Sequence, residues 1–272
     1  MLETRNLTIR FGGHVAVDHV SCAFQASTLT AIVGPNGAGK TTYFNLISGQ
    51  LPASEGSVHL NGEDITALPV SSRTHRGLGR AFQLTQLFPN LSVVENVRLA
   101  VQSRKHEGLN LWTVWLDHRN TLQLAHELVD RVRLADKAQA SASSLPHGDQ
   151  RKLEVAMLMA LDPAVYMFDE PTAGMSVDEV PVILELIRNL KARADKTILL
   201  VEHKMDVVRE LADRIIVLHN GKLMADGDPE TVIASPVVQQ AYLGLAEVSL
   251  SAESTPTPNP ALPPQGGSSQ HD

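Results

Sequence analysis

The chain has 272 residues, of which 43% are hydrophobic and 19% are charged, so its composition excludes wholesale disorder and allows one large domain or two small ones. Lys and Arg total 23 against 30 Asp and Glu, for a formal net charge of −7, and this acidic balance argues against a dedicated nucleic-acid-binding protein. The chain has one cysteine, a charged N-terminus and no apolar run of the ~18 residues that a membrane helix needs, which predicts a soluble, cytoplasmic protein without a signal peptide.

The first third of the chain has patterns typical of strands. Leu7, Ile9 and Phe11 alternate with polar residues, as on a half-buried strand. Residues 29–33 form a short apolar run that stops at a glycine, which is typical of a buried parallel strand. Asn61 and Gly62 indicate a tight turn.

The middle third is expected to be helical, and the last third to alternate between strands and helices. Apolar residues recur at helical spacing over 122–132 and 153–160. The later strands are predicted at residues 165–168, 197–201 and 215–218, and the helices between them at 182–190 and 207–211. This alternation predicts an α/β fold with helices packed on a parallel sheet. Residues 249–272 are rich in proline and poor in large apolar side chains, so we expect a disordered tail after a folded domain over 1–248.

A glycine-rich segment follows the apolar run of residues 29–33 and matches the phosphate-loop motif G-x-x-x-x-G-K-[ST]. Its glycines let backbone N–H groups approach phosphate oxygens, and the helix that follows adds its partial positive charge. Lys40 is expected to meet the β and γ phosphates, and the Thr41 hydroxyl to ligate Mg²⁺. The alternative is a glycine-rich turn that binds nothing. The candidate nucleotide-binding residues are Gly34, Pro35, Asn36, Gly37, Ala38, Gly39, Lys40, Thr41 and Thr42.

Two carboxylates follow the apolar run of residues 165–168. Asp169 is expected to hold Mg²⁺, directly or through water. Glu170 is expected to act as the general base that orients a water on the γ phosphate. The alternative for Glu170 is that it only caps the next turn, which Pro171 marks.

With these motifs, residues 2–245 resemble the ATP-binding subunit of an ABC transporter. The resemblance implies a P-loop NTPase core with an N-terminal antiparallel β-subdomain and an inserted helical subdomain at about residues 84–160. It implies that Phe11 stacks on adenine and that His203 is the catalytic switch histidine. It implies that Gln83 senses the γ phosphate and belongs to the catalytic and metal site. Without the resemblance, Phe11 and His203 are more simply core or structural residues, and Gln83 a surface residue.

The family signature, usually Leu-Ser-Gly-Gly-Gln, is matched here only in part. Leu145 and Gly148 agree with it, whereas Pro146, His147 and Asp149 do not. In this family the signature of one subunit faces the ATP bound to the other, so the resemblance implies a homo- or heterodimer with a second ABC ATPase. Pro146 has neither a hydroxyl nor an N–H for that phosphate. In the loop after Glu170, Ser176 stands where the family often has aspartate.

A finer resemblance is to the ATPases of high-affinity branched-chain amino acid importers. It rests on residues 10–13, 43–49, 148–154, 173–175 and 241–244 and on the segment 101–121. It implies ATP and Mg²⁺ as cofactors, two membrane permease subunits and a periplasmic solute-binding protein as partners, no nucleic acid, and a peripheral location on the cytoplasmic face of the inner membrane. Importers of amides or urea, and a soluble ABC-type ATPase outside transport, are the alternatives.

Two aromatic features could contact the permeases. Trp112 and Trp115 are three residues apart and share a face on a helix, where they form either the local core of the insertion or a partner contact. The segment from Gln83 to Pro89 is the preferred docking candidate, because it joins the sheet to the helical subdomain.

Overall fold

The computed structural model of the chain describes residues 1–81, 87–104 and 114–240, and of residues 114–118 the backbone only. The strands are β1 (Leu2–Phe11), β2 (His14–Phe24), β3 (Leu29–Val33), β4 (Glu55–Leu60), β5 (Glu63–Asp64), β6 (Leu78–Ala81), β7 (Val165–Asp169), β8 (Thr197–Val201), β9 (Arg214–His219) and β10 (Lys222–Gly227). The helices are α1 (Lys40–Ser48), α2 (Val70–His75), α3 (Val93–Arg104), α4 (Val114–Arg131), α5 (His147–Leu161), α6 (Val180–Lys191), α7 (Met205–Leu211) and α8 (Pro229–Ala234), with short 3-10 helices η1 (Ala135–Lys137) and η2 (Ala142–Ser144).

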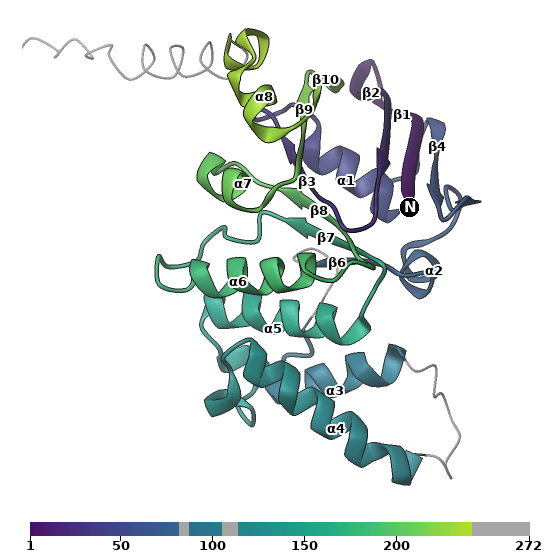
Figure 1. Cartoon of the computed structure of the whole chain (residues 1–272). Helices are drawn as coiled ribbons and strands as arrows, with labels where there is room; N and C mark the ends of the chain where they lie inside the picture. The colour runs from purple at the N-terminus through teal and green to yellow at the C-terminus, as the bar shows by residue number, and fades with distance from the viewer. Residues whose placement is uncertain (82–86, 105–113, 241–272) are drawn as a thin grey trace, which may run out of the picture.

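A six-stranded sheet in the order β10-β9-β3-β8-β7-β6 lies at the centre of the described chain (Figure 1). The strands from β9 to β6 are parallel, and β10 is antiparallel to β9. The strands β3, β7 and β8 are buried along their whole length, which explains their continuous apolar sequences. Because the carboxyl ends of parallel strands lie at one edge of a sheet, the segments that follow β3, β7 and β8 meet there.

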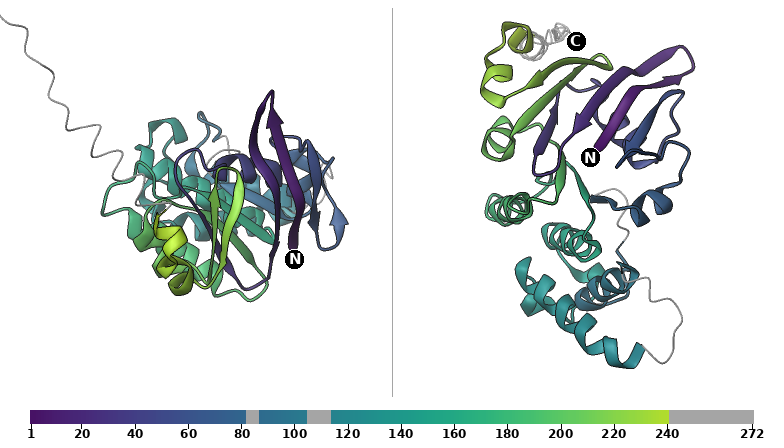
Figure 2. Two further views of the ribbon diagram at one scale, coloured as in Figure 1. Left: turned by 90° about the horizontal axis from the view of Figure 1, so that it is seen from above. Right: turned by 45° about the vertical axis from the view of Figure 1, so that its right-hand side comes forward.

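A second sheet, in the order β2-β1-β4-β5, is wholly antiparallel. The helix α1 packs between it and the central sheet, since Tyr43, Phe44 and Ile47 share one apolar cluster with Leu7 and Met167. In the right-hand view of Figure 2 the purple strands β1 and β2 lie at the top of the molecule and the teal helices α3 and α4 at the bottom. The predicted α/β fold with an N-terminal antiparallel β-unit is thus confirmed.

The two faces of the central sheet are covered by different elements, as strand geometry requires. On β7, Val165 and Met167 point into the cluster that contains α1. Tyr166 and Phe168 point to the opposite face, which is covered by α5 and α6. A one-residue shift in the register of this strand would therefore exchange its two sets of apolar contacts.

The helices α3, α4 and α5 pack against one another and continue the apolar cluster under α6. They fall within the range predicted for an inserted helical subdomain, whose limits at 84 and 160 and whose status as a unit stay a prediction. The predicted tail at 249–272 and Trp112 lie outside the described residues, and so does the side chain of Trp115. Among the helices that the structure describes, none is both long and apolar enough to cross a membrane.

The carboxyl end of α1 is held by a buried arginine from α2. Arg73 donates from Nη1 to the carbonyl oxygens of Leu46 and Ile47, at 2.8 and 2.6 Å. It also donates from Nε to Leu68 and from Nη2 to Thr66, at 3.0 and 2.7 Å. The last carbonyls of a helix have no partner within the helix, so Arg73 stabilises the end of α1 opposite the phosphate-loop motif.

Candidate functional site

Residues 34–39 connect β3 to α1 and carry the phosphate-loop motif. A Cβ atom at Gly34 would lie 2.2 Å from the carbonyl oxygen of Leu218, and one at Gly39 would lie 2.4 Å from that of Ala16. Gly39 also has a positive φ of 97°, so the loop requires glycine at both positions. The first turn of α1 has no side-chain cap. Its N–H groups and the positive end of its dipole are therefore directed at the loop.

Lys40, the first residue of α1, lies under the loop. Its Nζ donates to the carbonyl oxygens of Gly34 and Pro35, at 2.7 and 2.9 Å. Burial lowers the pKa of Lys40, and the nearby carboxylates of Glu170 and Asp169 oppose that shift. The ammonium group thus lies next to both predicted acids, as the phosphate-loop interpretation requires.

The other residues of the motif differ in their exposure. Asn36, Gly37 and Thr41 are exposed, whereas Ala38 is buried and Thr42 is half-buried. A phosphate group approaching the loop would therefore meet its backbone and the Thr41 hydroxyl from the solvent side.

Asp169 and Glu170 follow β7 at the same edge of the central sheet, in different environments. The Asp169 carboxylate is buried, and Arg80 of β6 donates to its Oδ2 at 2.7 Å. Burial raises the pKa of Asp169, and the Arg80 guanidinium opposes this. Glu170 has a positive φ of 51° and donates its N–H to the carbonyl oxygen of Val201 at 2.9 Å.

The side chain of Glu170 contacts the predicted switch histidine. His203 donates from Nε2 to Glu170 Oε1 at 2.7 Å, and both side chains are about 40% exposed. This pairing directs the Glu170 carboxylate across the sheet edge to the end of β8. The structure therefore brings together Lys40, Asp169, Glu170 and His203.

A buried carboxylate that the sequence did not single out orients the segment containing His203. Glu202 Oε2 accepts from the backbone N–H groups of His203 and Lys204, at 2.8 and 3.2 Å. Its Oε1 accepts from the Thr172 hydroxyl at 2.6 Å. The loops after β7 and β8 are thus joined directly. The only sequence signal for Glu202 is its place beside His203.

The signature segment precedes α5. Pro146 is the N-cap residue, with φ −55° and ψ 156°, and the helix begins at His147. Leu145 is buried, and its carbonyl oxygen accepts from the side-chain amide of Gln150 at 3.0 Å. Proline is well suited to this position, because no intrahelical partner exists there for an N–H.

Asp149, another departure from the signature, is buried in the first turn of α5. Lys152 donates to its Oδ1 at 2.8 Å and Lys137 to its Oδ2 at 2.5 Å. Burial acts to raise the pKa of Asp149, but the two lysines outweigh it and hold the pKa below its usual range. The carboxylate thus joins η1 to the start of α5.

Ser176 and Glu179 are joined by hydrogen bonds just before α6, whose N-cap residue is Glu179. Glu179 Oε2 accepts from the Ser176 backbone N–H at 3.2 Å and from its hydroxyl at 3.0 Å. Glu179 Oε1 pairs with Lys152 at 3.5 Å, and a Cβ at Gly148 would lie 2.2 Å from this carboxylate. Ser176, which stands in place of the family's common aspartate, therefore bonds to Glu179 and does not cap α6 with its side chain.

Two further predicted residues are less closely tied to this edge. Phe11 is 50% exposed at the end of β1, and its hairpin reaches the phosphate loop through the contact between Ala16 and Gly39. Gln83 lies outside the described residues. Phe11 as the adenine contact and Gln83 as a catalytic and metal-site residue therefore stay predictions.

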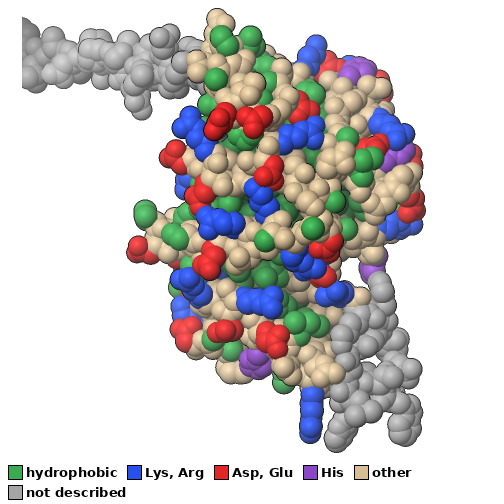
Figure 3. All heavy atoms as spheres, viewed as in Figure 1, with side chains coloured by type: hydrophobic (Ala, Val, Ile, Leu, Met, Phe, Trp, Pro, Cys, Tyr) green, Lys and Arg blue, Asp and Glu red, His purple; other side chains and the backbone are tan. Residues whose placement is uncertain are grey.

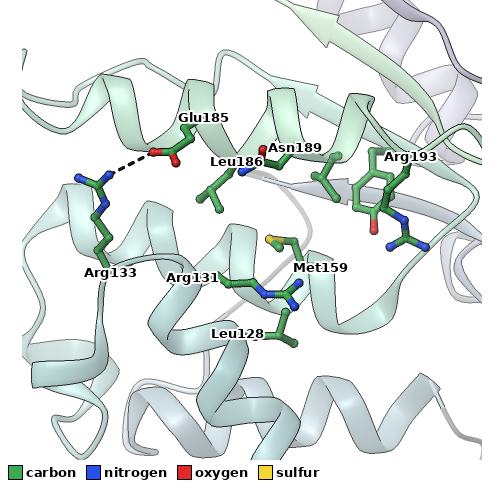
Figure 4. Close-up of a pocket in the computed structure, with 10 residues that line it drawn as sticks. Leu128, Arg131, Arg133, Met159, Glu185, Leu186, Asn189 and Arg193 are labelled. Carbon is green, nitrogen blue, oxygen red and sulfur yellow. Dashed lines mark hydrogen bonds and ion pairs between the residues drawn. The ribbon is translucent and has the colours of Figure 1, made fainter.

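A cavity of about 470 Å³ lies between α4, α5 and α6 (Figure 4). Tyr166 lines it near the start of β7, whereas Asp169 lies at the end of that strand, so the cavity is distant from the phosphate-loop edge. Two of its arginines are paired, Arg133 with Glu185 at 3.1 Å and Arg193 with Asp162 at 2.8 Å. Figure 3 shows acidic and basic side chains interspersed over this face of the molecule. The cavity offers no set of groups like that around Lys40.

Comparisons with known proteins agree with this geometry. The family model of the ABC transporter matches residues 17–173. The branched-chain amino acid transport ATP-binding protein BraF of Pseudomonas aeruginosa is 36% identical over 90% of this chain and 98% of its own length. LivG of Escherichia coli K12, named for the same transport, is 36% identical over 90% of this chain and 98% of its own length. An ATP-binding cassette of an ABC transporter, solved in its ADP conformation, has a TM-score of 0.75, is 28% identical and covers 90% of this chain and 98% of that chain.

The contacts of Glu179 before α6 give a testable stability prediction. Replacing Glu179→Ala removes the hydrogen bonds from Ser176 and the ion pair with Lys152, so the free energy of unfolding should fall by about 1 kcal/mol, the typical net contribution of an intramolecular hydrogen bond. Chemical denaturation measures this. The matched control is Glu185→Ala in the same helix, which removes only the exposed ion pair with Arg133 and should leave the denaturation midpoint nearly unchanged. Equal midpoint shifts in the two variants would contradict a stabilising role for the contacts of Glu179.

Proposed function

The chain belongs to the ABC transporter ATP-binding family, and we propose that it binds and hydrolyses ATP as the nucleotide-binding subunit of an importer for branched-chain amino acids. The observation that carries the enzymatic part is the convergence of Lys40, Asp169, Glu170 and His203 at one edge of the central sheet. The named relatives BraF and LivG support the solute class.

In this proposal the chain's own groups bind phosphate and move one proton. Backbone N–H groups of the loop between Asn36 and Gly39 and the Lys40 ammonium bind the phosphates of ATP and neutralise their charge. Glu170 accepts a proton from the water that attacks the γ phosphate, yielding ADP and phosphate. His203 donates to the same carboxylate at 2.7 Å and orients it. General-base catalysis of this kind contributes ~10²–10⁴ in rate.

The residues at this edge also fit Mg²⁺. Thr41 supplies a hydroxyl and Asp169 a carboxylate, and oxygen is the ligand that Mg²⁺ prefers. Among the described residues there is no cluster of three or more His, Cys, Asp or Glu side chains that could hold a metal alone. Two protein oxygens together with phosphate oxygens are the usual arrangement for Mg²⁺ at such sites. When bound, the ion neutralises charge on the phosphates.

The assembly proposed for this subunit has several partners. A second ABC ATPase completes the dimer, in which the segment from Leu145 to Gly148 faces the nucleotide of the opposite subunit. Phe11 contacts adenine and Gln83 responds to the γ phosphate. Two membrane permeases hold the dimer at the cytoplasmic face of the inner membrane, and a periplasmic protein delivers the solute.

The assigned roles of Lys40 and Glu170 can be separated by mutation. The change Lys40→Ala removes the phosphate cation, so the Kd for ATP should rise by at least tenfold. The change Glu170→Gln keeps the shape of the site but removes the base, so nucleotide binding should persist while turnover falls ~10²–10⁴-fold. Calorimetry measures binding and phosphate release measures turnover, with Glu185→Ala as a remote control. Wild-type turnover in Glu170→Gln would refute its role as base.

Pro146 gives a prediction about the dimer. A serine at this N-cap position offers a hydroxyl both to the first turn of α5 and to the opposite γ phosphate. A hydrogen bond to a charged group contributes about 1.5–3 kcal/mol, so Pro146→Ser should raise turnover or strengthen the ATP-bound dimer. Steady-state ATPase rates and sedimentation, with the partner ATPase and permeases present, test this. A fall in both quantities would show that the signature requires proline.

The solute assignment is tested by transport. The subunit is co-expressed with its permeases, partner ATPase and solute-binding protein, and uptake of labelled leucine, isoleucine and valine is compared with uptake of urea and short amides. We expect ATP-dependent uptake of the branched-chain amino acids, lost in Glu170→Gln. Uptake of urea or amides alone would replace the proposed solute. Purification with nucleic acid and without permeases would refute a transport role.

A further inference from the structure

Arg80 connects three elements that surround the phosphate-loop edge. Its side chain is completely buried on β6. Nη2 donates to Oδ2 of Asp169 at 2.7 Å. Nη1 donates to three side-chain oxygens at or just after the end of α1, namely Asn45 Oδ1 at 2.7 Å, Ser48 Oγ at 2.9 Å and Gln50 Oε1 at 2.8 Å. The guanidinium also lies over the ring of Phe44, 5.3 Å from its centroid.

Folding stability alone does not favour a buried ion pair such as that of Arg80 and Asp169. Desolvating two charges is costly, and replacing a buried ion pair by well-packed apolar residues is often neutral or stabilising. An apolar side chain at position 80 could join the cluster of Phe44 and Met167, which are completely buried beside it. The pair therefore calls for an explanation other than the packing of the sheet.

The hydrogen-bond geometry indicates that the Arg80–Asp169 pair orients the Asp169 carboxylate. A carboxylate at the end of a strand can rotate about its side-chain torsions, and ordering it costs conformational entropy. The planar guanidinium of arginine has donors in fixed directions. At Arg80, the donors to Asn45, Ser48 and Gln50 fix the guanidinium relative to α1, and the donor to Asp169 then fixes the carboxylate. The carboxylate is thereby oriented relative to the same helix that carries Lys40 and Thr41.

We propose that Arg80 is a positioning residue that orients Asp169 relative to α1, so that a divalent cation bound with nucleotide meets a carboxylate already in place. The proposal rests on the proposed function, which makes Asp169 a cation ligand. It assigns to Arg80 an effect on the cation and not on the nucleotide itself. Partners that orient a metal ligand typically contribute 10–100-fold to metal affinity.

The test is the Mg²⁺ dependence of nucleotide binding. The Kd for ADP is measured by calorimetry with Mg²⁺ and with EDTA, in the wild type and in Arg80→Met. The ratio of the two values reports the coupling between cation and nucleotide, and it does not depend on turnover. We expect Arg80→Met to reduce this ratio by about tenfold or more, while the Kd in EDTA changes by less than about threefold. A ratio within twofold of the wild type would overturn the proposal.

Arg73→Met is the matched control for lost stability. Arg73 is also a buried arginine that bonds to residues of α1, but its bonds go to backbone carbonyls and none goes to Asp169. This variant should lower the melting temperature and keep the wild-type coupling ratio. If Arg73→Met reduces the ratio as much as Arg80→Met does, the effect belongs to the position of α1 in general and the proposal fails.

A second set of variants covers the case in which Arg80→Met does not fold. Arg80→Lys keeps the charge but lacks the planar fork, so it should still lower the coupling ratio, by a smaller factor. In the background of Asp169→Asn, Arg80→Lys should have no additional effect on the ratio. The proposal would be overturned if Arg80→Lys kept the wild-type coupling ratio. It would also be overturned if Arg80→Lys lowered the ratio by the same factor in the Asp169→Asn background as in the wild type. If the wild type itself shows no Mg²⁺ dependence, the assignment of Asp169 as a cation ligand fails, whatever the Arg80 variants do.

Discussion

The parallel pairing of β3, β7 and β8 is the constraint on which the candidate site depends. Because β8 lies between β3 and β7, the segments that leave their carboxyl ends are neighbours although they are distant in sequence. The hydrogen bond from the Glu170 N–H to the Val201 carbonyl oxygen extends this pairing beyond β7. The side chains of Glu170 and His203 are hydrogen-bonded next to it. The register of these three buried strands therefore determines how far Glu170, His203 and Lys40 lie from one another.

A second consequence of this edge is that charged side chains are buried close to opposite charges. Lys40 and Asp169 are both buried, and each has an opposite charge nearby. In an environment of low dielectric constant, an unpaired charge costs far more than it does in water. Removing one member of such a set is expected to perturb the others, so single substitutions here measure the set and not one residue.

Local patterns in the sequence predicted the phosphate loop, most strands of the central sheet and the two acids at the end of β7, whereas the antiparallel N-terminal sheet and the role of His203 came from the family resemblance. The phosphate loop was predictable because Gly34 and Gly39 are required by backbone approach within a contiguous segment, and the strands ending near Asp169 and His203 because each is a continuous apolar run. Arg80 and Glu202 were not singled out, because their partners are distant in sequence and only the order of strands brings them together. In the sequence Arg80 stands three residues before Gln83, and Glu202 stands directly before His203. Neither pattern shows what the side chain of Arg80 or Glu202 contacts.

The departures at Asp149 and Ser176 belong to one series of polar contacts that joins α5 to α6. Lys152 donates to Asp149 and pairs with Glu179, and Glu179 accepts from the Ser176 hydroxyl. The first turn of α5 is thus tied to the first turn of α6. A rigid link between them lets a change at one turn move the other, and Pro146 starts α5 at a fixed φ within that link. The loss of one hydroxyl is therefore a local change in a segment whose geometry is maintained by charges elsewhere, which is why the signature can depart from its usual sequence and still begin a helix at His147.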